Sequence, residues 1–278
     1  MRAFQRQDPP DISSRDGAGM QFAMPSLTPV VKMLLIANAV MFVLTDIVLQ
    51  APPSGAFLRS LAITPELWQS FLLPIWQLVT YGFLHGDLGH LVGNLLFLYF
   101  LGTMLEGIVG SRRFLVFYLA SVAIAGFCQL LVSLVRGEPY LILGASGGVL
   151  AIVCAVATLR PQTRIIFILF PITLKTLAIL YVGFDVYTVI KDLQGQASGV
   201  ASFAHLSGAA VGFLAVRKGW IWSDPVATIE KVRERRAEES AEEQRERLDK
   251  LLEKIHREGI GALSSREKAF LKKMSRRD

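Results

Sequence analysis

The stretch LILGASGGVLAIVCAVATL, residues 141–159, decides how the whole chain is interpreted, because it places small and polar residues inside apolar sequence. It has no charged residue and is about long enough to cross a bilayer as a helix. Gly144 and Gly148 are four residues apart, so we expect them to share one helical face that a second helix can approach closely. Ser146 alone is explained as a packing residue bonded to its own backbone, but in this setting we expect it to act against a neighbouring helix.

The composition of the chain indicates a membrane protein. Of 278 residues 52% are hydrophobic, and the mean hydropathy of +0.44 is too high for an ordinary soluble domain. The sequence predicts an all-α polytopic fold with six transmembrane helices. The six hydrophobic runs cover residues 31–50, 87–109, 114–135, 141–159, 176–190 and 200–216.

The distribution of lysine and arginine predicts the orientation. With the N-terminus inside, eleven of these residues lie in or beside the inside loops. The outside loops then hold only Arg59, Arg136 and Lys191. By the positive-inside rule both termini are cytoplasmic, and we expect a multi-pass protein of a bacterial inner membrane.

Three regions are expected along the chain. Residues 1–30 are polar and form a flexible cytoplasmic extension, residues 31–218 form the membrane domain, and residues 219–278 form a charged helical cytoplasmic tail. Residues 221–278 hold 15 lysines and arginines and 13 acidic residues. Their interleaved signs argue against nucleic-acid binding and favour a solvated helix that touches membrane lipid or binds an unknown cytoplasmic partner.

Two segments of the membrane domain are less regular. Residues 51–86 combine prolines with tryptophans and phenylalanines, which is typical of a loop partly embedded in the outer interface. Residues 165–170 are apolar but too short to cross, so we expect them at the cytoplasmic boundary. Residues 195–199 form a glycine-rich loop that, with Gly183 and Asp185 of the preceding span, is a candidate for gating.

Neither a metal nor another cofactor is expected. Cys128 and Cys154 lie in apolar runs and serve as small hydrophobic residues. His85 and His90 are five apart, and no cluster of cysteine and histidine has the spacing of metal ligands.

Polar residues recur at one depth of the predicted spans. His90 and Asn94 share a helical face, and His205 shares its face with Gly208 and Gly212, which have the small-xxx-small spacing of closely packed helices. These polar residues and Ser146 fall about five residues past the outer end of their spans, roughly 8 Å deep at about 1.5 Å per residue. An ionisable residue at such a depth indicates function.

The residue types indicate acyl transfer. We expect Ser146 to be the nucleophile and His205 its general base, since a neutral imidazole can take the hydroxyl proton. Oxyanion donors are expected from the Asn94 amide, the His90 ring and the Ser146 backbone N–H. No acidic residue is evident at that depth to orient His205, so a Ser-His dyad is predicted.

Together the motifs resemble those of the rhomboid intramembrane serine proteases. They are His85-x4-His90-x3-Asn94, Gly144-Ala145-Ser146-Gly147, Ala204-His205-x2-Gly208-x3-Gly212 and the segment Glu106-x3-Gly110-Ser111. The resemblance covers roughly residues 31–218 and implies a six-helix rhomboid bundle. It also implies the same roles for the serine, the histidines and the asparagine, and hydrolysis of peptide bonds in single-span transmembrane proteins near the outer membrane face. Some members have Trp-Arg in the first loop, where this chain has Trp76-Gln77, so the packing of that loop is open.

Two alternatives remain. A catalytically inactive rhomboid-like protein would bind or remodel membrane proteins, although such relatives typically lack the serine or the histidine. A helical transporter or channel would explain intramembrane histidines, but it would not explain Gly-x-Ser-Gly opposite His-x2-Gly-x3-Gly.

Overall fold

The computed structural model describes residues 26–50, 52, 55–69, 73–137, 139–167, 170–196 and 201–274. Most of the expected N-terminal extension, residues 1–25, therefore lies outside the described residues. The chain divides into two compact units, Met1–Trp222 and Ser223–Asp278.

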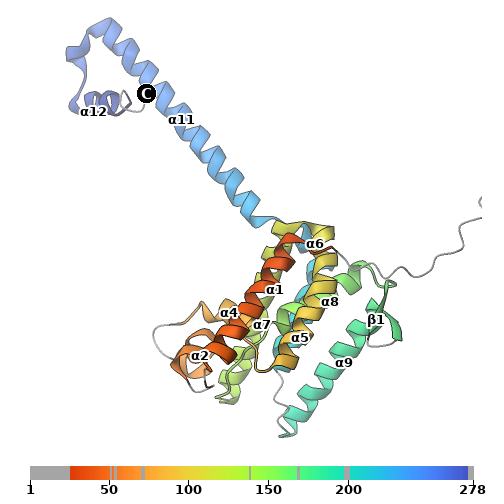
Figure 1. The fold of residues 1–278 in the computed structure, drawn as a ribbon. Coiled ribbons are helices and arrows are strands. Elements are labelled where there is room, and N and C mark those ends of the chain that lie inside the picture. Colours follow the sequence, from red (N-terminus) through yellow and green to blue (C-terminus); the bar gives the residue numbers. More distant parts are fainter. Residues whose placement is uncertain are drawn as a thin grey trace, which may run out of the picture. The chain divides into compact units, whose positions relative to one another are not determined.

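The first unit is a helical bundle with one small hairpin (Figure 1). The first expected span contains α1 Pro29–Phe42 and η1 Val43–Val48. The loop after it contains α2 Ala56–Leu61, α3 Pro65–Trp68, α4 Gln77–Thr80 and η2 Tyr81–Phe83. Then follow α5 Leu88–Phe97, η3 Leu98–Gly102, α6 Thr103–Val109, α7 Ser111–Arg136 and α8 Ser146–Leu159. The unit ends with β1 Arg164–Phe167, β2 Phe170–Thr173, α9 Leu174–Leu193, α10 Ser202–Arg217 and η4 Trp220–Trp222.

Three helical stretches of the described residues are long and apolar enough to cross a membrane: Pro29–Val48, Leu88–Val109 and Ser111–Arg136. The helix α8, Ser146–Leu159, is apolar but shorter. The chain is therefore an integral membrane protein. Three of the six expected spans meet this criterion of length and composition.

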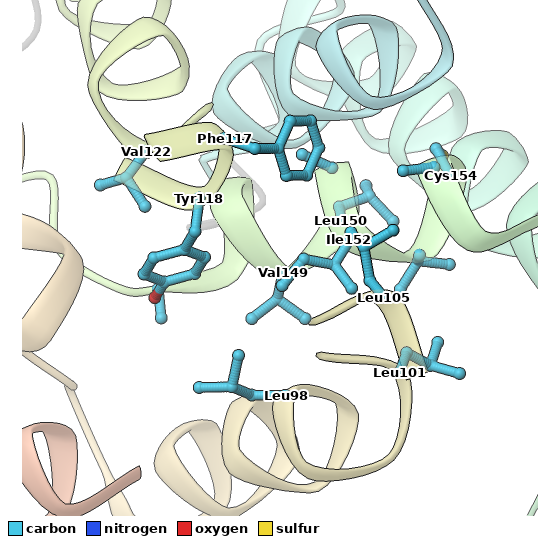
Figure 2. Close-up of a cluster of buried hydrophobic side chains, with 14 of the residues drawn as sticks. Leu98, Leu101, Leu105, Phe117, Tyr118, Val122, Val149, Leu150, Ile152 and Cys154 are labelled. Carbon is cyan, nitrogen blue, oxygen red and sulfur yellow. The ribbon is translucent and has the colours of Figure 1, made fainter. Parts of the chain in front are cut away.

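The helix α8 lies at the centre of the bundle. Every residue from Gly147 to Ala157 is buried, so this helix contacts other helices around its whole circumference. Its side chains Val149, Leu150 and Ile152 belong to a cluster that includes residues of η3, α6 and α7 (Figure 2). Packing on all sides gives the residue at the N-terminus of this helix, Ser146, a fixed position.

Glycines let α10 approach the backbone of α8. A Cβ built on Gly208 would lie 2.0 Å from the carbonyl oxygen of Gly147, and one on Gly212 would lie 2.1 Å from that of Ala151. Such distances leave no room for any side chain.

The other two expected packing glycines lie elsewhere. Gly148 faces α7, since its added Cβ would lie 2.5 Å from Val122 and 3.0 Å from Tyr118. Gly144 precedes α8 and has φ +124°, so it does not share a helical face with Gly148 as expected. The periodicity argument was wrong there because the helix begins two residues later, at Ser146.

Buried Glu106 of α6 fixes the beginning of α1. Its carboxylate accepts hydrogen bonds from the backbone N–H groups of Val30 at 3.1 Å and Val31 at 2.9 Å. The hydroxyl groups of Thr28 and Ser111 also donate to it. Two open N–H groups of the first turn of α1 are thus satisfied by a charge from another helix.

The loop between α1 and α5 packs around Gln77. The Gln77 side-chain oxygen accepts from the Trp68 indole N–H at 3.0 Å and the Thr64 N–H at 3.2 Å, while its nitrogen donates to the Arg59 carbonyl at 2.9 Å. Gln77 stands where some rhomboids have arginine. Because its side-chain oxygen and nitrogen are both bonded, this buried glutamine orders the loop.

The apolar segment 165–170 contributes to a β-hairpin, which departs from the all-α expectation. β1 and β2 pair antiparallel, with Arg164 opposite Thr173 and Phe167 opposite Phe170. The Leu174 N–H also bonds to the Thr163 carbonyl at 2.9 Å, closing the hairpin immediately before α9.

The second unit is helical, as expected of the tail. It contains α11 Pro225–Glu258, η5 Ile260–Ala262 and α12 Ser265–Met274. Ser264 and Glu267 form a capping box: the Ser264 N–H donates to the Glu267 carboxylate at 2.7 Å, and the Glu267 N–H donates to the Ser264 Oγ at 3.3 Å. Hydrogen bonds from Ser264 and from Lys254 lower the pKa of Glu267 to about 2.

Candidate active site

Ser146 is held at the N-terminus of α8 by the turn before it. The Gly144 N–H donates to the Tyr81 carbonyl at 3.0 Å, and the positive φ of Gly144 turns the chain into the helix. A Cβ on Gly144 would lie 2.7 Å from the His90 ring, so only glycine lets that ring lie against the turn. The Ser146 hydroxyl consequently lies near His90 at the N-terminus of α8.

His205 meets Ser146 from α10. Its Nε2 lies 2.7 Å from the Ser146 Oγ, a hydrogen-bonding distance. The contact of Gly208 with Gly147 sets how close the two helices come, and Gly208 lies one turn after His205. The Ala204 N–H also donates to the side-chain oxygen of Gln129 on α7 at 3.2 Å, which satisfies a donor in the first turn of α10.

No acidic residue was expected beside His205, but the structure has one there. Asp185 of α9 lies with its Oδ1 2.8 Å from the His205 Nδ1, and the Asp185 side chain is buried. The depth argument would have found it, since Asp185 lies five residues before the outer end of the predicted span 176–190. The sequence predicts Asp185 only as part of a candidate gate, together with Gly183.

His90 and Asn94 line the same cavity as Ser146 and His205. The cavity has a volume of about 190 Å³, and its other walls are apolar side chains and glycines. Those lining residues are Gly89, Gly93, Phe97, Val149, Leu150, Val153 and Tyr181. The amide nitrogen of Asn94 is buried and has no hydrogen-bond partner within the described part of the chain. A buried donor left open beside a serine hydroxyl is suited to an anionic ligand or intermediate.

His85 contacts His90 and is not among the residues that line the cavity. The two rings make an edge contact with centroids 5.1 Å apart. Burial, together with the charge on His90, lowers the pKa of His85 to about 4. His85 is therefore neutral at physiological pH and supports the position of His90.

The arrangement can perform acyl transfer. It combines a hydroxyl, an imidazole bonded to it, a carboxylate bonded to that imidazole, and an amide donor without a partner in the described residues, on a residue that lines the same cavity. The described residues include no group of three or more His, Cys, Asp or Glu side chains able to hold a metal ion. Cys154 is buried in α8, and Cys128 of α7 is a free thiol.

Comparison with known proteins gives consistent matches. A model of the Rhomboid domain matches residues 73–221, and a model of a family of unknown function (DUF6576) matches residues 229–277. The chain is 32% identical over 205 residues to RHOMBOID-like protein 12, mitochondrial, of Arabidopsis thaliana, covering 67% of this chain and 58% of that protein.

It is also 29% identical over 155 residues to the presenilin-associated rhomboid-like proteins, mitochondrial, of Rattus norvegicus and Homo sapiens. These matches cover 53% of this chain and 40% of those proteins, so the chain spans about half the length of the curated relatives it matches. The relatives are named as mitochondrial, which does not support the expected bacterial inner membrane.

Proposed function

The chain belongs to the rhomboid family, and from that membership and the geometry of the site we propose that it is an intramembrane serine endopeptidase. It hydrolyses peptide bonds of transmembrane proteins near the outer membrane face. The observation that carries the proposal is the 2.7 Å distance between the Ser146 hydroxyl and the His205 Nε2.

In this mechanism His205 takes the hydroxyl proton as Ser146 Oγ attacks the carbonyl carbon of the substrate. The proton then passes to the leaving amine, and an acyl-enzyme forms. A water molecule then attacks the acyl carbon while His205 takes its proton. His205 gives that proton to Ser146 Oγ as the new carboxyl end is released. Both steps need one histidine that alternates between base and acid, as a neutral imidazole does at physiological pH.

The oxyanion of the tetrahedral intermediate is stabilised by three donors in this proposal. They are the amide nitrogen of Asn94, the ring of His90 and the backbone N–H of Ser146, which belong to residues that line one cavity. The Asn94 nitrogen has no hydrogen-bond partner in the described residues, so it is available to an oxyanion. The Ser146 N–H lies in the first turn of α8, where backbone donors have no intrahelical acceptor. Each such donor contributes on the order of 10² to 10³ in rate.

We also propose the membrane arrangement that the sequence predicts. Six spans with both termini cytoplasmic place the four polar residues about 8 Å below the outer surface, where a single-span substrate can reach them. The helices α8, α9 and α10 complete the six spans in this arrangement. The second unit, Ser223–Asp278, is then a cytoplasmic tail open to lipid or to a soluble partner.

The test is covalent labelling of the purified protein in detergent with a fluorophosphonate probe, which reacts with activated serines. Wild type should label, while Ser146→Ala and His205→Ala should not. Ser121→Ala is the matched control, since the Ser121 hydroxyl is buried and bonded at 2.7 Å to the Phe117 carbonyl of its own helix. It should label as wild type does.

The labelling distinguishes the proposal from its alternative. A folded wild type that never labels, in detergent or in lipid vesicles, would favour an inactive rhomboid-like protein that binds or remodels membrane proteins. Equal labelling of Ser146→Ala would show that another residue reacts and would refute the assignment of the nucleophile.

A further inference from the structure

A carboxylate is bonded to the far side of the histidine that meets Ser146. The Asp185 Oδ1 lies 2.8 Å from the His205 Nδ1, while the His205 Nε2 lies 2.7 Å from the Ser146 Oγ. The residue exposure of Asp185 is 1%. Three side chains from three helices, α9, α10 and α8, thus form one continuous chain of hydrogen bonds.

We propose that Asp185 is a positioning residue that fixes the tautomer and the ring orientation of His205. This inference rests on the proposed protease function. It changes the reaction centre from a Ser-His dyad to a Ser-His pair held by a third residue on α9.

The need for such a residue follows from the two ring nitrogens of histidine. A neutral imidazole has one N–H donor and one acceptor nitrogen. His205 can take the Ser146 proton only if Nε2 is the acceptor, and then Nδ1 must hold the hydrogen. An ionised carboxylate accepts and cannot donate, so Asp185 beside Nδ1 selects that tautomer.

The same contact acts after proton transfer. When the hydroxyl proton moves to Nε2 and Oγ bonds to the substrate carbon, the ring becomes a cation. The Asp185 carboxylate stabilises this cation through its hydrogen bond with Nδ1. The proton on Nε2 then goes to the leaving amine, which returns His205 to its neutral form.

A purely structural role accounts less well for the acid. A second contact already joins α9 to α10, because the hydroxyl groups of Thr188 and Ser202 lie 2.5 Å apart and both residues are buried. The other carboxylate oxygen, Asp185 Oδ2, is buried without a hydrogen-bond partner in the described residues. An acid in an apolar helix is unfavourable, and uncharged groups would pack α9 equally well.

The test compares wild type with Asp185→Asn. The amide has the shape of the acid, but its N–H₂ donates to Nδ1 and so selects the opposite tautomer. The maximal rate of fluorophosphonate labelling should fall by about 10²- to 10⁴-fold, the upper figure being the loss that a wrong tautomer causes in a soluble Ser-His-Asp protease. The probe concentration for half-maximal rate should not change, because Asp185 does not touch the probe.

A matched control is Asp192→Asn, the same change on the same helix seven residues along. It should leave the labelling rate unchanged. Thr188→Val removes the other polar contact between α9 and α10 and should lower stability with a much smaller loss of rate.

Nitrogen NMR of the ¹⁵N-histidine-labelled protein shows which ring nitrogen of His205 carries the hydrogen. This would not change if Asp185 served only to pack the helices. The chain has four histidines, so the His205 signals can be assigned with a single substitution. In wild type the hydrogen should be on Nδ1, and in Asp185→Asn on Nε2. If wild type has its hydrogen on Nε2, the inference is wrong even where the variant cannot be folded.

Failure of this inference is distinct from failure of the proposed function. Unchanged labelling of Asp185→Asn beside an active wild type would overturn the role of Asp185 and leave the protease intact. A wild type that does not label would overturn the protease, while the NMR spectrum would still report whether Asp185 sets the tautomer.

Discussion

Replacing Gly208 with alanine should separate the two helices that hold Ser146 and His205. The added Cβ would lie 2.0 Å from the Gly147 carbonyl oxygen, whereas ordinary contacts of a Cβ begin at 3.4 Å, so the helices must move apart by about 1.4 Å along that line. The obstructing atom belongs to the backbone and cannot rotate away. Overpacking of this kind destabilises by about 1 to 3 kcal/mol, and we expect the upper end.

The same movement affects the reaction. His205 lies one turn before Gly208, and Ser146 is next to Gly147, so the displacement reaches their hydrogen bond almost undiminished. The new distance is then up to about 4.1 Å, the sum of this displacement and the present 2.7 Å, and such a distance is beyond hydrogen bonding. A misplacement of about 1 Å can lower a rate by about 10²-fold, and we expect at least that loss in fluorophosphonate labelling.

The assay is thermal unfolding in detergent, followed by labelling at a temperature where the variant remains folded. Gly107→Ala is the control, because Gly107 lies in α6 and has no atom within 4 Å of an added Cβ among the described residues. Gly107→Ala should leave the free energy of unfolding unchanged or raise it by up to about 1 kcal/mol, because alanine has the higher helix propensity. Wild-type stability and labelling in Gly208→Ala would refute the close contact of α8 with α10.

Two further predictions concern regions outside the reacting groups. Because the pKa of His85 is about 4 in the folded protein and near 6.5 unfolded, protonation favours unfolding; stability should be full above pH 6.5 and fall by about 3 kcal/mol towards pH 4. Unfolding measured across that range should show this loss in wild type and not in His85→Phe, and a pH-independent wild type would contradict the buried neutral ring. Truncation after Trp222 should leave probe labelling unchanged, since the second unit is compact by itself; complete loss of labelling in a stable, inserted truncation would show that the tail is required.

The sequence predicted best those features that depend on residues close together in the chain. Ser264 and Glu267 have the spacing of a capping box and Gly259 is of the type that ends helices, and the structure has the box and the end of α11 at Glu258. The lengths of the apolar runs predict that Ser146 and His205 lie at one depth, and the structure has their side chains 2.7 Å apart.

Features that depend on which helices are neighbours were predicted less well. Periodicity identifies the face on which Gly148 lies, but it does not say that α7 and not α10 covers that face. Asp185 was missed for a related reason, since an acid in a span was interpreted by its own helix and not by the helix beside it. The hairpin of β1 and β2 depends on pairing across its two strands, which a short apolar run does not reveal.

The carboxylate of Glu106 also fixes an order of events during synthesis. Two of its donors belong to the start of α1, and Val31 precedes Glu106 by 75 residues. Ribosomes add roughly 5 to 20 residues per second, so the first helix must wait about 4 to 15 s before the acid that closes its N-terminus exists. During that interval its open N–H groups need water or lipid headgroups, which keeps this end of α1 at the membrane surface until α6 arrives. In the finished bundle the N-terminus of α1, the first of these helices to be made, is therefore bonded to a side chain of α6, which is made after it.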